Sequence, residues 1–433
     1  MNWKHLWFLL ILVPACNRVT PVEEISIENS GILIEEIEDA ETSIDLAWSQ
    51  WRGGSEGVAS NESLPTKWSE SSNVRWSADI PGRGHSSPIV VGDLVVVGTA
   101  TKDTEQQWVI AYDREDGRER WKTPVHTGGF PSTREVHRKA TNANGTVASD
   151  GNTFVVAHLN SDRVWVTGLN VDGEKVWQTD IGAFRSKFGY APSPVIYKSL
   201  AIVAADNGGG GYLVGIELKS GKIAWRVARG TAGSYSSPAI ISDGERDQVV
   251  ITGGDRMASY DPTSGELIWE TPCIAEATCG TIVSSNGRLF ASGGYPDKET
   301  VAISTNGELL WSHRTKIYEP SLIIDGENIF AFSDDGIAYC WSAEDGKTNW
   351  KKRVGGKFSG SPVLSNGLIY VADLSGNDYV IRASGEQYEM VAKNQLGDDC
   401  YASPAIAGDA IIFRVGVGQE NKRKEKLYCI AAE

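Results

Sequence analysis

The chain has 433 residues, of which 56 are acidic and 41 basic, so its net charge at neutral pH is −15. This acidic balance argues against DNA or RNA as a partner, because nucleic-acid binding depends on Lys and Arg that neutralise phosphates. A chain of this length would ordinarily form about three domains, but the repeats described below predict one large ring instead.

The first 15 residues predict a secretory signal peptide. Basic side chains precede a short apolar stretch at residues 6–13, and a small residue stands before Cys16, which is the pattern of a cleaved signal. The apolar stretch is too short to remain as a membrane-spanning helix. Residues 12–16 resemble a bacterial lipobox, which implies lipid attachment to Cys16; Asn17 beside it favours the outer membrane. The alternative is a secreted protein with a free Cys16 thiol.

Residues 16–47 form an acidic segment in which Arg18 is the one basic residue. Such a composition gains little from burial and predicts a flexible tether. A coil of about thirty residues spans roughly 30 Å, so the tether would hold a domain off a membrane surface. A peptide motif for a partner is the alternative. The acidic residues are Glu23, Glu24, Glu28, Glu35, Glu36, Glu38, Asp39, Glu41 and Asp45.

Residues 48–433 are expected to form one propeller domain, and from residue 76 onward they repeat one pattern, in which a turn ending in Gly is followed four residues later by Trp. The first copy has Asn73 in place of this turn. The spacings between successive anchors are 45, 56, 48, 44, 42, 39 and 40 residues, with Met390 in the eighth slot. A period of about 40–45 residues with strand-like content is typical of propeller blades. The repeat anchors are Trp76, Trp121, Trp177, Trp225, Trp269, Trp311 and Trp350.

Each repeat predicts four antiparallel strands. Short runs rich in Val, Ile and aromatic residues are separated by Asp-Gly or Asn-Gly pairs, which favour hairpin turns. The first run of each repeat begins with small residues such as Ser86-Ser87-Pro88, because innermost strands converge on a narrow axis. The outermost strand has room for Trp, which we expect to seal the gap to the next blade. Met390 is expected to fill the same gap.

The order of the strands predicts how the ring closes. A lone strand at residues 73–80 opens the repeat region, and the last three strands, near residues 403–407, 410–415 and 426–432, lack a fourth. The N-terminal strand should therefore complete the last blade. The sequence predicts an all-β, monomeric, eight-bladed β-propeller of four-stranded antiparallel blades.

The cysteines and histidines predict no metal site, since no HxxxH, HExxH or CxxC spacing occurs. Cys273 and Cys279 flank one connection between blades and are candidates for a disulfide in an oxidising compartment. Cys340 and Cys429 occupy equivalent third-strand positions and are expected to be buried. No pairing for the remaining Cys400 is predicted.

The repeat resembles that of the PQQ-like β-propeller family, with residues 261–269 (DPTSGELIW) as its cleanest copy and residues 48–54 (WSQWRGG) similar to the opening of envelope members. The family includes quinoprotein alcohol dehydrogenases and the non-enzymatic propeller lipoprotein of the outer-membrane β-barrel assembly machinery. The resemblance therefore implies the fold and leaves these two functions open.

Three observations weigh against a quinone enzyme. The dehydrogenases of this family carry an adjacent Cys pair, which is absent here, and a Trp in the chamber floor, whereas the Trp residues beyond Trp76 lie in repeat strands. Asp398, Asp399 and Glu276 lie near inner-strand entries but form no recognisable Ca²⁺ set. We expect no cofactor and no catalysis, with PQQ and Ca²⁺ as the alternative.

Two long connections on one face concentrate cations and aromatic residues, at residues 122–145 and 179–191. Arg and aromatic residues are enriched in binding hot spots, so we expect this quarter of the face to bind an envelope protein, an acidic peptide or an acidic glycan. The alternative is that the insertions only pack over their own blades. The candidate contacts are Phe130, Arg134, His137, Arg138, Lys139, Phe184, Arg185, Lys187, Phe188 and Tyr190.

Residues that precede other inner strands are expected at the mouth of the channel, without an assigned role: Glu276, Glu319, Lys357 and Tyr401. The sequence as a whole predicts a non-enzymatic, lipid-tethered scaffold in the bacterial cell envelope, at the periplasmic face of the outer membrane. The alternative is a quinoprotein dehydrogenase-like oxidoreductase that uses the central channel.

Overall fold

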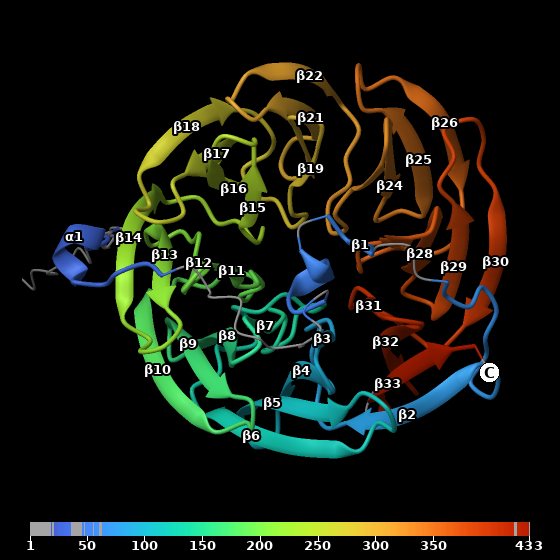
Figure 1. Ribbon diagram of the computed structural model, residues 1–433, viewed down its shortest axis with the longest axis horizontal. Coiled ribbons are helices and arrows are strands. Elements are labelled where there is room, and N and C mark those ends of the chain that lie inside the picture. Colours follow the sequence, from blue (N-terminus) through green and yellow to red (C-terminus); the bar gives the residue numbers. More distant parts are fainter. Residues whose placement is uncertain are drawn as a thin grey trace, which may run out of the picture.

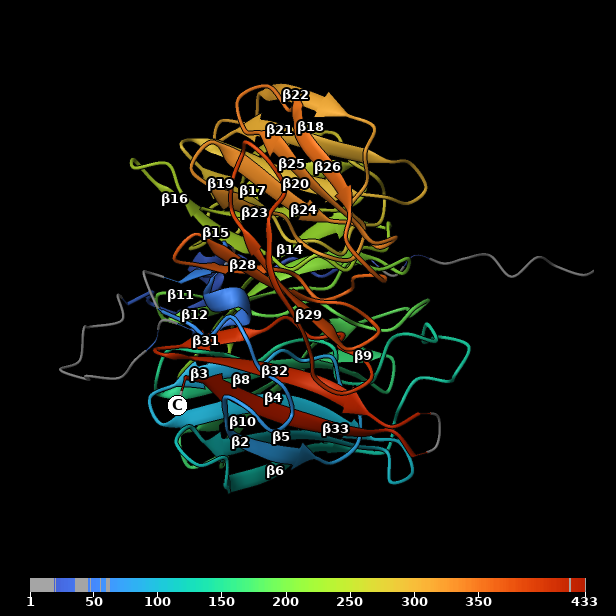
Figure 2. The same ribbon diagram turned by 90° about the vertical axis from the view of Figure 1, so that its right-hand side faces the viewer.

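The computed structural model describes residues 19, 21–35, 46, 48–54, 56–59, 63–419 and 422–432. Eight four-stranded antiparallel blades form a ring (Figure 1), and the sheet of one blade is extended by a fifth, parallel strand, so the predicted eight-bladed propeller is confirmed. Figure 2 shows the same ring from the side. The predicted signal peptide and Cys16 lie outside the described residues. None of the described helices is long and apolar enough to cross a membrane.

The first four blades follow one another along the chain, each running from an inner to an outer strand. Blade 1 contains β3 (Ile89–Val91), β4 (Leu94–Thr101), β5 (Gln106–Asp113) and β6 (Glu119–Thr127). Blade 2 contains β7 (Ala148–Ser149), β8 (Thr153–Asn160), β9 (Arg163–Asn170) and β10 (Lys175–Ala183). Blade 3 contains β11 (Val195–Tyr197), β12 (Leu200–Ala204), β13 (Gly211–Glu217) and β14 (Ile223–Gly230). Blade 4 contains β15 (Ala239–Ser242), β16 (Asp247–Thr252), β17 (Arg256–Tyr260) and β18 (Leu267–Pro272).

The other four blades complete the circle. Blade 5 contains β19 (Val283–Ser285), β20 (Arg288–Gly293), β21 (Glu299–Ser304) and β22 (Leu309–His313). Blade 6 contains β23 (Ile323–Asp325), β24 (Asn328–Phe332), β25 (Ile337–Ser342) and β26 (Thr348–Arg353). Blade 7 contains β27 (Val363–Ser365), β28 (Leu368–Ala372), β29 (Asn377–Arg382) and β30 (Met390–Gln395). Blade 8 contains β31 (Ala405–Ala407), β32 (Ala410–Val417), β33 (Lys424–Ala431) and β2 (Val74–Ile80).

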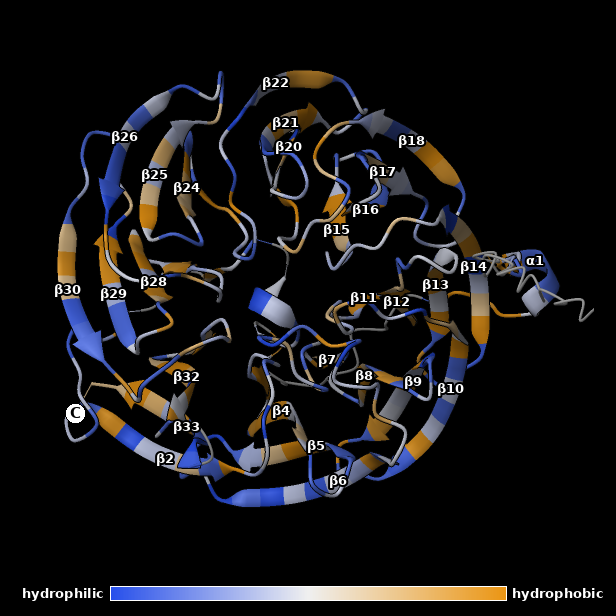
Figure 3. Ribbon diagram, turned by 180° about the vertical axis from the view of Figure 1, so that it is seen from behind, coloured by the Kyte–Doolittle hydropathy of each residue, from blue (hydrophilic) through white to orange (hydrophobic). Residues whose placement is uncertain are grey.

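The core lies between the blades, and it follows the hydropathy of the strands. The third strand β25 is buried along its centre, whereas the outer strand β26 is mostly exposed; in Figure 3, β25 is pale to orange and β26 mainly blue. Interior strands are covered on both faces by neighbouring blades, so they carry continuous apolar runs. The outer strands meet solvent and tolerate charge.

The repeat anchors join each blade to the next. The ring of Trp76 covers Gly117, where an added Cβ would lie 2.6 Å from the indole. Only glycine fits that turn, because its φ is positive (73°) and the ring lies directly against it. The indole N–H groups of all seven anchors donate to a backbone carbonyl of the following blade: Trp76 to Arg114, Trp121 to Val171, Trp177 to Leu218, Trp225 to Pro262, Trp269 to Thr305, Trp311 to Ala343 and Trp350 to Ser384.

The prediction for Met390 is wrong, because this side chain is 47% exposed. Trp68, which precedes β2, is buried instead (6% exposed) and packs at 5.6 Å from Phe413 and 6.3 Å from Tyr370, between blades 7 and 8. Its indole N–H donates to Asp378 Oδ2 at 3.0 Å. An aromatic side chain from outside the repeats therefore fills the place where the eighth anchor is missing.

The ring closes through β2, as predicted, because β2 pairs antiparallel with β33 as the fourth strand of blade 8. A buried ion pair of this blade also reaches across the closure. Arg414 donates to Glu425 Oε2 at 2.5 Å and to the carbonyls of Ser86 and Gly98 in blade 1 at 2.9 and 2.6 Å. The interface between blade 8 and blade 1 is therefore stabilised by buried polar contacts as well as by apolar packing.

A ring of hydroxyl groups surrounds the axis, at the small residues that begin the inner strands. The amide N–H of Ser87 in blade 1 donates to Thr146 Oγ1 of blade 2 at 2.9 Å. On the other side of blade 1, the N–H of Ser403 of blade 8 donates to Ser87 Oγ at 2.9 Å. Space alone does not explain these small residues, since seven of the eight hydroxyls also accept a hydrogen bond from an adjacent blade, and the exception is Thr281, whose Oγ1 has no partner among the described residues. The other links are Thr146 to Ser193, Ser193 to Ser237, Thr281 to Ser321, Ser321 to Ser361 and Ser361 to Ser403.

Two short stretches, residues 48–54 and 56–59, close one end of the central channel. The short helix η1 (Trp51–Gly53) lies at the centre of the ring (Figure 1), and β1 (Val58–Ala59) pairs parallel with β27. The buried guanidinium of Arg52 donates to the carbonyls of Leu322 and Pro362 at 2.8 and 3.3 Å. These bonds tie the segment to the inner strands of blades 6 and 7, so it forms a floor beneath the channel.

The expectation of a flexible tether differs from the structure at residues 21–35. Ile25 exchanges two backbone hydrogen bonds with Arg226 of the outer strand β14, at 3.0 and 2.9 Å. The following helix α1 (Ile27–Ser30) lies beside β14 (Figure 1), and Ile32 is buried against the core of blades 3 and 4. Apolar residues placed between the acidic ones, which the net composition conceals, provide this docking.

Replacement of Ile25 by proline should release the segment from blade 3. Proline has no backbone N–H, so the bond to the Arg226 carbonyl is lost; once the weakened segment detaches, the amide of Arg226 also loses its acceptor, the carbonyl of residue 25. We expect that amide to exchange with deuterium at least ~10-fold faster, as expected when local protection of ~1.4 kcal/mol is removed. Ile25→Ala, which keeps the N–H, is the control. Equal protection of Arg226 in both variants would contradict the docking.

Candidate functional site

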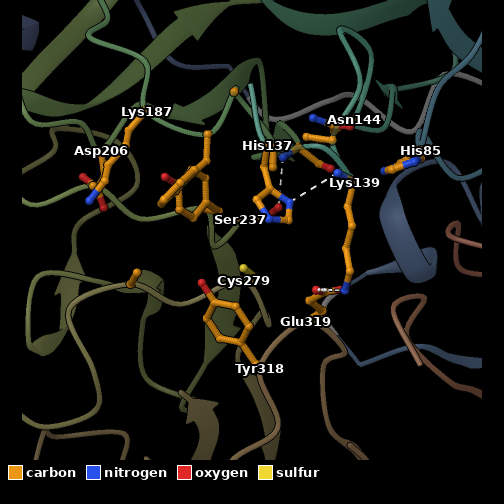
Figure 4. Close-up of a pocket in the computed structure, with 18 of the residues that line it drawn as sticks. His85, His137, Lys139, Asn144, Lys187, Asp206, Ser237, Cys279, Tyr318 and Glu319 are labelled. Carbon is orange, nitrogen blue, oxygen red and sulfur yellow. Dashed lines mark hydrogen bonds and ion pairs between the residues drawn. The ribbon is translucent and has the colours of Figure 1, made fainter. Parts of the chain in front are cut away.

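The central channel widens into a cavity of about 810 Å³ on the face opposite residues 48–59. Trp51 lies in its floor, hydroxyl groups of the axial ring, such as Ser87 and Ser403, surround its lower part, and the connections between blades form its walls. Figure 4 shows side chains that line it. Its volume lies in the range of small-molecule and peptide pockets.

The two predicted loops lie together at this cavity. The amide of His137 donates to the carbonyl of Phe188 at 3.2 Å, and Ser186 Oγ donates to the Glu135 carbonyl at 2.6 Å. Six of the ten predicted contact residues line the cavity: His137, Lys139, Phe184, Arg185, Lys187 and Phe188. Phe130, Arg134 and Arg138 belong to the same loops but not to the lining.

The prediction that Tyr190 contacts a partner is wrong, because this residue lies in the core. It is 5% exposed, its ring packs edge-on against Phe184 at 5.5 Å, and its hydroxyl donates to the carbonyl of Ala204 at 2.9 Å. A partner at the surface would not reach this side chain. Phe184 is also buried, at 4% exposure, so only a small part of its side chain lines the cavity. The aromatic pair therefore supports the loop, whereas Phe188 is exposed at the mouth.

One ion pair crosses the cavity. Lys139 follows blade 1 and Glu319 follows blade 5, which places their loops on opposite sides of the ring, yet Lys139 Nζ lies 2.7 Å from Glu319 Oε1 (Figure 4). Both side chains keep partial exposure, at 30% and 21%. Partly exposed ion pairs contribute about 1 kcal/mol or less, so this contact is readily exchanged for another.

Several residues of the site were not identified as contacts by the sequence. His85 stacks on Tyr401 with ring centres 4.4 Å apart, and Tyr235 and Tyr318 complete an aromatic belt with Phe188. Glu276, Glu319 and Tyr401, expected at the channel mouth, do line the cavity, whereas Lys357 does not. Their place in the repeat could have identified the tyrosines from the sequence. Tyr235, Tyr318 and Tyr401 all lie one or two residues before the Ser/Pro-rich segment that begins an inner strand.

Four cations act on His85, of which Lys139 lines the cavity. Burial lowers the pKa of His85 well below its usual value, and the cations Arg83, Arg414, Arg423 and Lys139 lower that pKa further. Three carboxylates, on Glu319, Asp399 and Glu425, pair with Lys139, Arg414 and Arg423. His85 is therefore neutral at physiological pH, and its buried Nε2 has no hydrogen-bond partner among the described residues.

The cysteine of the site is a protonated thiol. Cys279 lines the cavity beside Tyr318 (Figure 4), and burial raises the pKa of its thiol to about 12. Cys273 packs instead against the core of blades 4 and 5. All five cysteines in the described part of the chain are free, so no disulfide joins Cys273 to Cys279 in this structure.

The cavity does not offer the donor set that PQQ with Ca²⁺ would require. No group of three His, Cys, Asp or Glu side chains with metal-ligand geometry occurs among the described residues. The carboxylate of Asp206 is held by the buried guanidinium of Arg229 at 2.8 Å, and that of Glu319 by Lys139. A Ca²⁺ ion needs several convergent oxygens, so the residues present do not fit this cofactor pair.

Comparison with known proteins places the chain in a family. The family model of the outer membrane protein assembly factor BamB matches residues 57–129, 105–310 and 296–392. Outer membrane protein assembly factors BamB from Yersinia pestis and Burkholderia pseudomallei are 23% and 22% identical over 344 and 365 residues. These alignments cover 74% and 78% of this chain, and 81% and 84% of the two relatives.

Solved structures show the same fold. The crystal structure of BamB from Moraxella catarrhalis has a TM-score of 0.60 at 15% identity, covering 81% of this chain and 98% of that one. A europium-containing methanol dehydrogenase has a TM-score of 0.66 at 11% identity, covering 89% of this chain and 98% of that one. Likeness at such identities shows the fold alone. Because the family model spans most of the ring, the chain belongs to the family of the outer membrane protein assembly factor BamB.

Proposed function

We propose that this protein is a non-enzymatic scaffold of the bacterial cell envelope that acts with other proteins in outer-membrane protein assembly. The observation that carries the proposal is the joined pair of loops, residues 128–147 and 184–194, at the mouth of a cavity without a metal-ligand set. Membership of the BamB family and the names of the curated relatives support it. The oxidoreductase reading has only a shared fold in its favour.

The proposal places the protein at the periplasmic face of the outer membrane, anchored by a lipid on Cys16. Docking of residues 21–35 on β14 then shortens the tether, because the six peptide units from Cys16 to Val22 span at most about 21 Å. Blade 3 would lie next to the membrane surface, and the loop face would point along it. The mass of the N-terminal peptide from the membrane fraction reports the lipid.

Charge reversal at the loop face tests the scaffold role. Arg138 is exposed and Lys139 partly exposed, and rim charges steer and hold partners of opposite sign. We expect the double variant Arg138→Glu/Lys139→Glu to recover at least ~5-fold less of the partner protein in crosslinking from native envelopes, a loss of about 1 kcal/mol.

A matched control places the same charge change elsewhere. Lys351 and Lys352 are exposed on β26, at the rim of blade 6, so Lys351→Glu/Lys352→Glu should leave recovery unchanged. Equal recovery from the wild type and the loop-face variant would favour the alternative, in which the two loops only pack over their own blades.

A further inference from the structure

The closed floor determines how a chain could enter the cavity. Residues 48–59 block the channel from below, through bonds of Trp48, Ser49 and Arg52 to inner strands of several blades. A polypeptide therefore has no route through the ring. It can occupy the cavity only by inserting an end, or by folding back on itself as a loop.

The molecule already holds one carboxylate in this cavity. Glu319 projects from one side of the mouth and meets Lys139, which comes from a loop four blades away, at 2.7 Å (Figure 4). Nothing in the local sequence of either loop requires this contact. The pair shows that a carboxylate fits beside Lys139, and its small net stability lets a ligand carboxylate replace it.

The surroundings of Lys139 favour a negative ligand. Among the described residues, the lining carries three cations, Lys139, Arg185 and Lys187, and three carboxylates, Asp206, Glu276 and Glu319. Asp206 is already held by the buried Arg229. Displacement of Glu319 by a ligand therefore leaves Glu276 as the remaining carboxylate of the described lining to oppose these three cations. The neutral His85 adds a buried ring nitrogen, Nε2, without a partner.

The rest of the lining suits a peptide. Tyr235, Tyr318, Tyr401 and Phe188 present aromatic surface, and hydroxyl and amide groups such as those of Asn144 lie between them. Tyr, Ser and Asn together are the residue types that paratopes use to bind peptide backbone and varied side chains. Capture of a terminal carboxylate is one of the recurrent modes of peptide recognition.

We propose that the cavity receives the carboxyl end of an extended polypeptide, whose terminal carboxylate takes the place of Glu319 at Lys139. This proposal specifies a ligand for the proposed scaffold. It rests on the proposed function in one respect, namely that the loop face is the face that binds partners. Aromatic side chains of the cavity hold the preceding residues, and Glu319 acts as an internal competitor that keeps the site filled until a chain end arrives.

Retention of paired peptides on the purified full-length protein tests this. The probe is a pool of randomised decapeptides, each made with a free carboxylate and as the carboxamide, and retained peptides are counted by mass spectrometry. We expect the acids to be retained at least ~10-fold more than the amides, since a hydrogen bond to a charged group contributes about 1.5–3 kcal/mol. Equal retention of the two forms would overturn the proposal.

Two substitutions should act in opposite directions. Glu319→Gln removes the internal competitor, so retention of the acids should rise several-fold, whereas Lys139→Met should lower it to the level of the amides. The double variant Lys139→Met/Glu319→Gln should also bind at the amide level, which excludes repulsion by an unpaired Glu319 as the cause. Glu276→Gln, a carboxylate of the same cavity outside this ion pair, is the control and should produce no rise.

Two further measurements distinguish a chain-end site from a site for small carboxylates, and failure of this inference from failure of the scaffold role. Propionate at the same concentration as the peptides should not displace them; complete displacement would show a site for small carboxylates and refute the chain-end proposal. Loss of crosslinking in Arg138→Glu/Lys139→Glu together with unselective peptide retention would leave the scaffold role standing and remove this inference. Circular dichroism of each variant confirms that the ring has folded.

Discussion

Replacement of Arg414 by methionine should destabilise the ring by about 3–5 kcal/mol. Arg414 and Glu425 are almost fully buried, at 2% and 1% side-chain exposure, and lie 2.5 Å apart. Removal of Arg414 leaves Glu425 Oε2 and two buried carbonyls without their donor, although Arg423 still lies 2.9 Å from Glu425 Oε1. Each hydrogen bond to a charged group contributes about 1.5–3 kcal/mol, so the losses together reach this range. The loss should appear as a lower urea midpoint for unfolding.

The same substitution opens the joint between the last and first blades. The guanidinium donates to carbonyls of Ser86 and Gly98, and the amide of Gly84 donates to Glu425 Oε2 at 3.1 Å. We therefore expect faster deuterium exchange at Gly84 than at blades 3–6. Such a pattern would locate the weakened contact at the closure.

Two further variants control for charge and for loss of the side chain. Arg118→Met removes an exposed partner of Asp116 and should cost less than ~1 kcal/mol. The double variant Arg414→Met/Glu425→Gln also removes the buried carboxylate that has lost its donor, and Arg423 keeps Asp399 as its partner, so it should regain most of the stability lost by Arg414→Met alone. Equal effects of Arg414→Met and Arg118→Met would contradict the role of the buried pair.

The Asp378→Asn variant should be more stable than the wild type at pH 8 and similar to it at pH 4. Burial and charge repulsion from Asp373 together raise the pKa of Asp378 to about 8, against the hydrogen bond from Trp68, which lowers it. Between pH 4 and 8 the folded protein keeps this proton while the unfolded chain releases it. Stability therefore falls as the pH rises, by up to about 1.4 kcal/mol for each pH unit.

Asparagine removes this dependence and keeps the acceptor for Trp68. The wild type should thus lose on the order of 4 kcal/mol more than Asp378→Asn between pH 4 and 8. Chemical unfolding of both proteins across this range measures it, with the exposed Asp297→Asn as the control. Parallel pH profiles of the wild type and Asp378→Asn would show that Asp378 ionises freely in the folded protein.

Neighbouring blades illustrate where sequence reasoning succeeded and failed. The Gly-to-Trp spacing recurs in six of the eight blades, and each anchor Trp meets a residue of the next repeat, such as Trp76 with Gly117. Such contacts are encoded locally and repeated, so the period shows them. Trp68 had no repeat to mark it, because its partner Asp378 lies 310 residues away.

The cavity shows the same division. The two loops rich in Arg, Lys and aromatic residues were identified from composition, and six of their ten candidate residues do line it. Composition could not separate Phe188, which is exposed, from Tyr190, which is buried in the core. Nor could it place Glu319 beside Lys139, since that contact depends on the diameter of the closed ring.

The amino-acid sequence by itself determined the number of blades, their four strands and the closure by the N-terminal strand, because these follow from contacts within one repeat or between adjacent repeats. Only the tertiary structure decided what fills the ring and its rim: the floor at residues 48–59, the docking of residues 21–35 on blade 3 and the ion pair across the cavity. These contacts join segments about 140 to 310 residues apart, and such partners are fixed by the geometry of the closed ring, for which no local pattern is required.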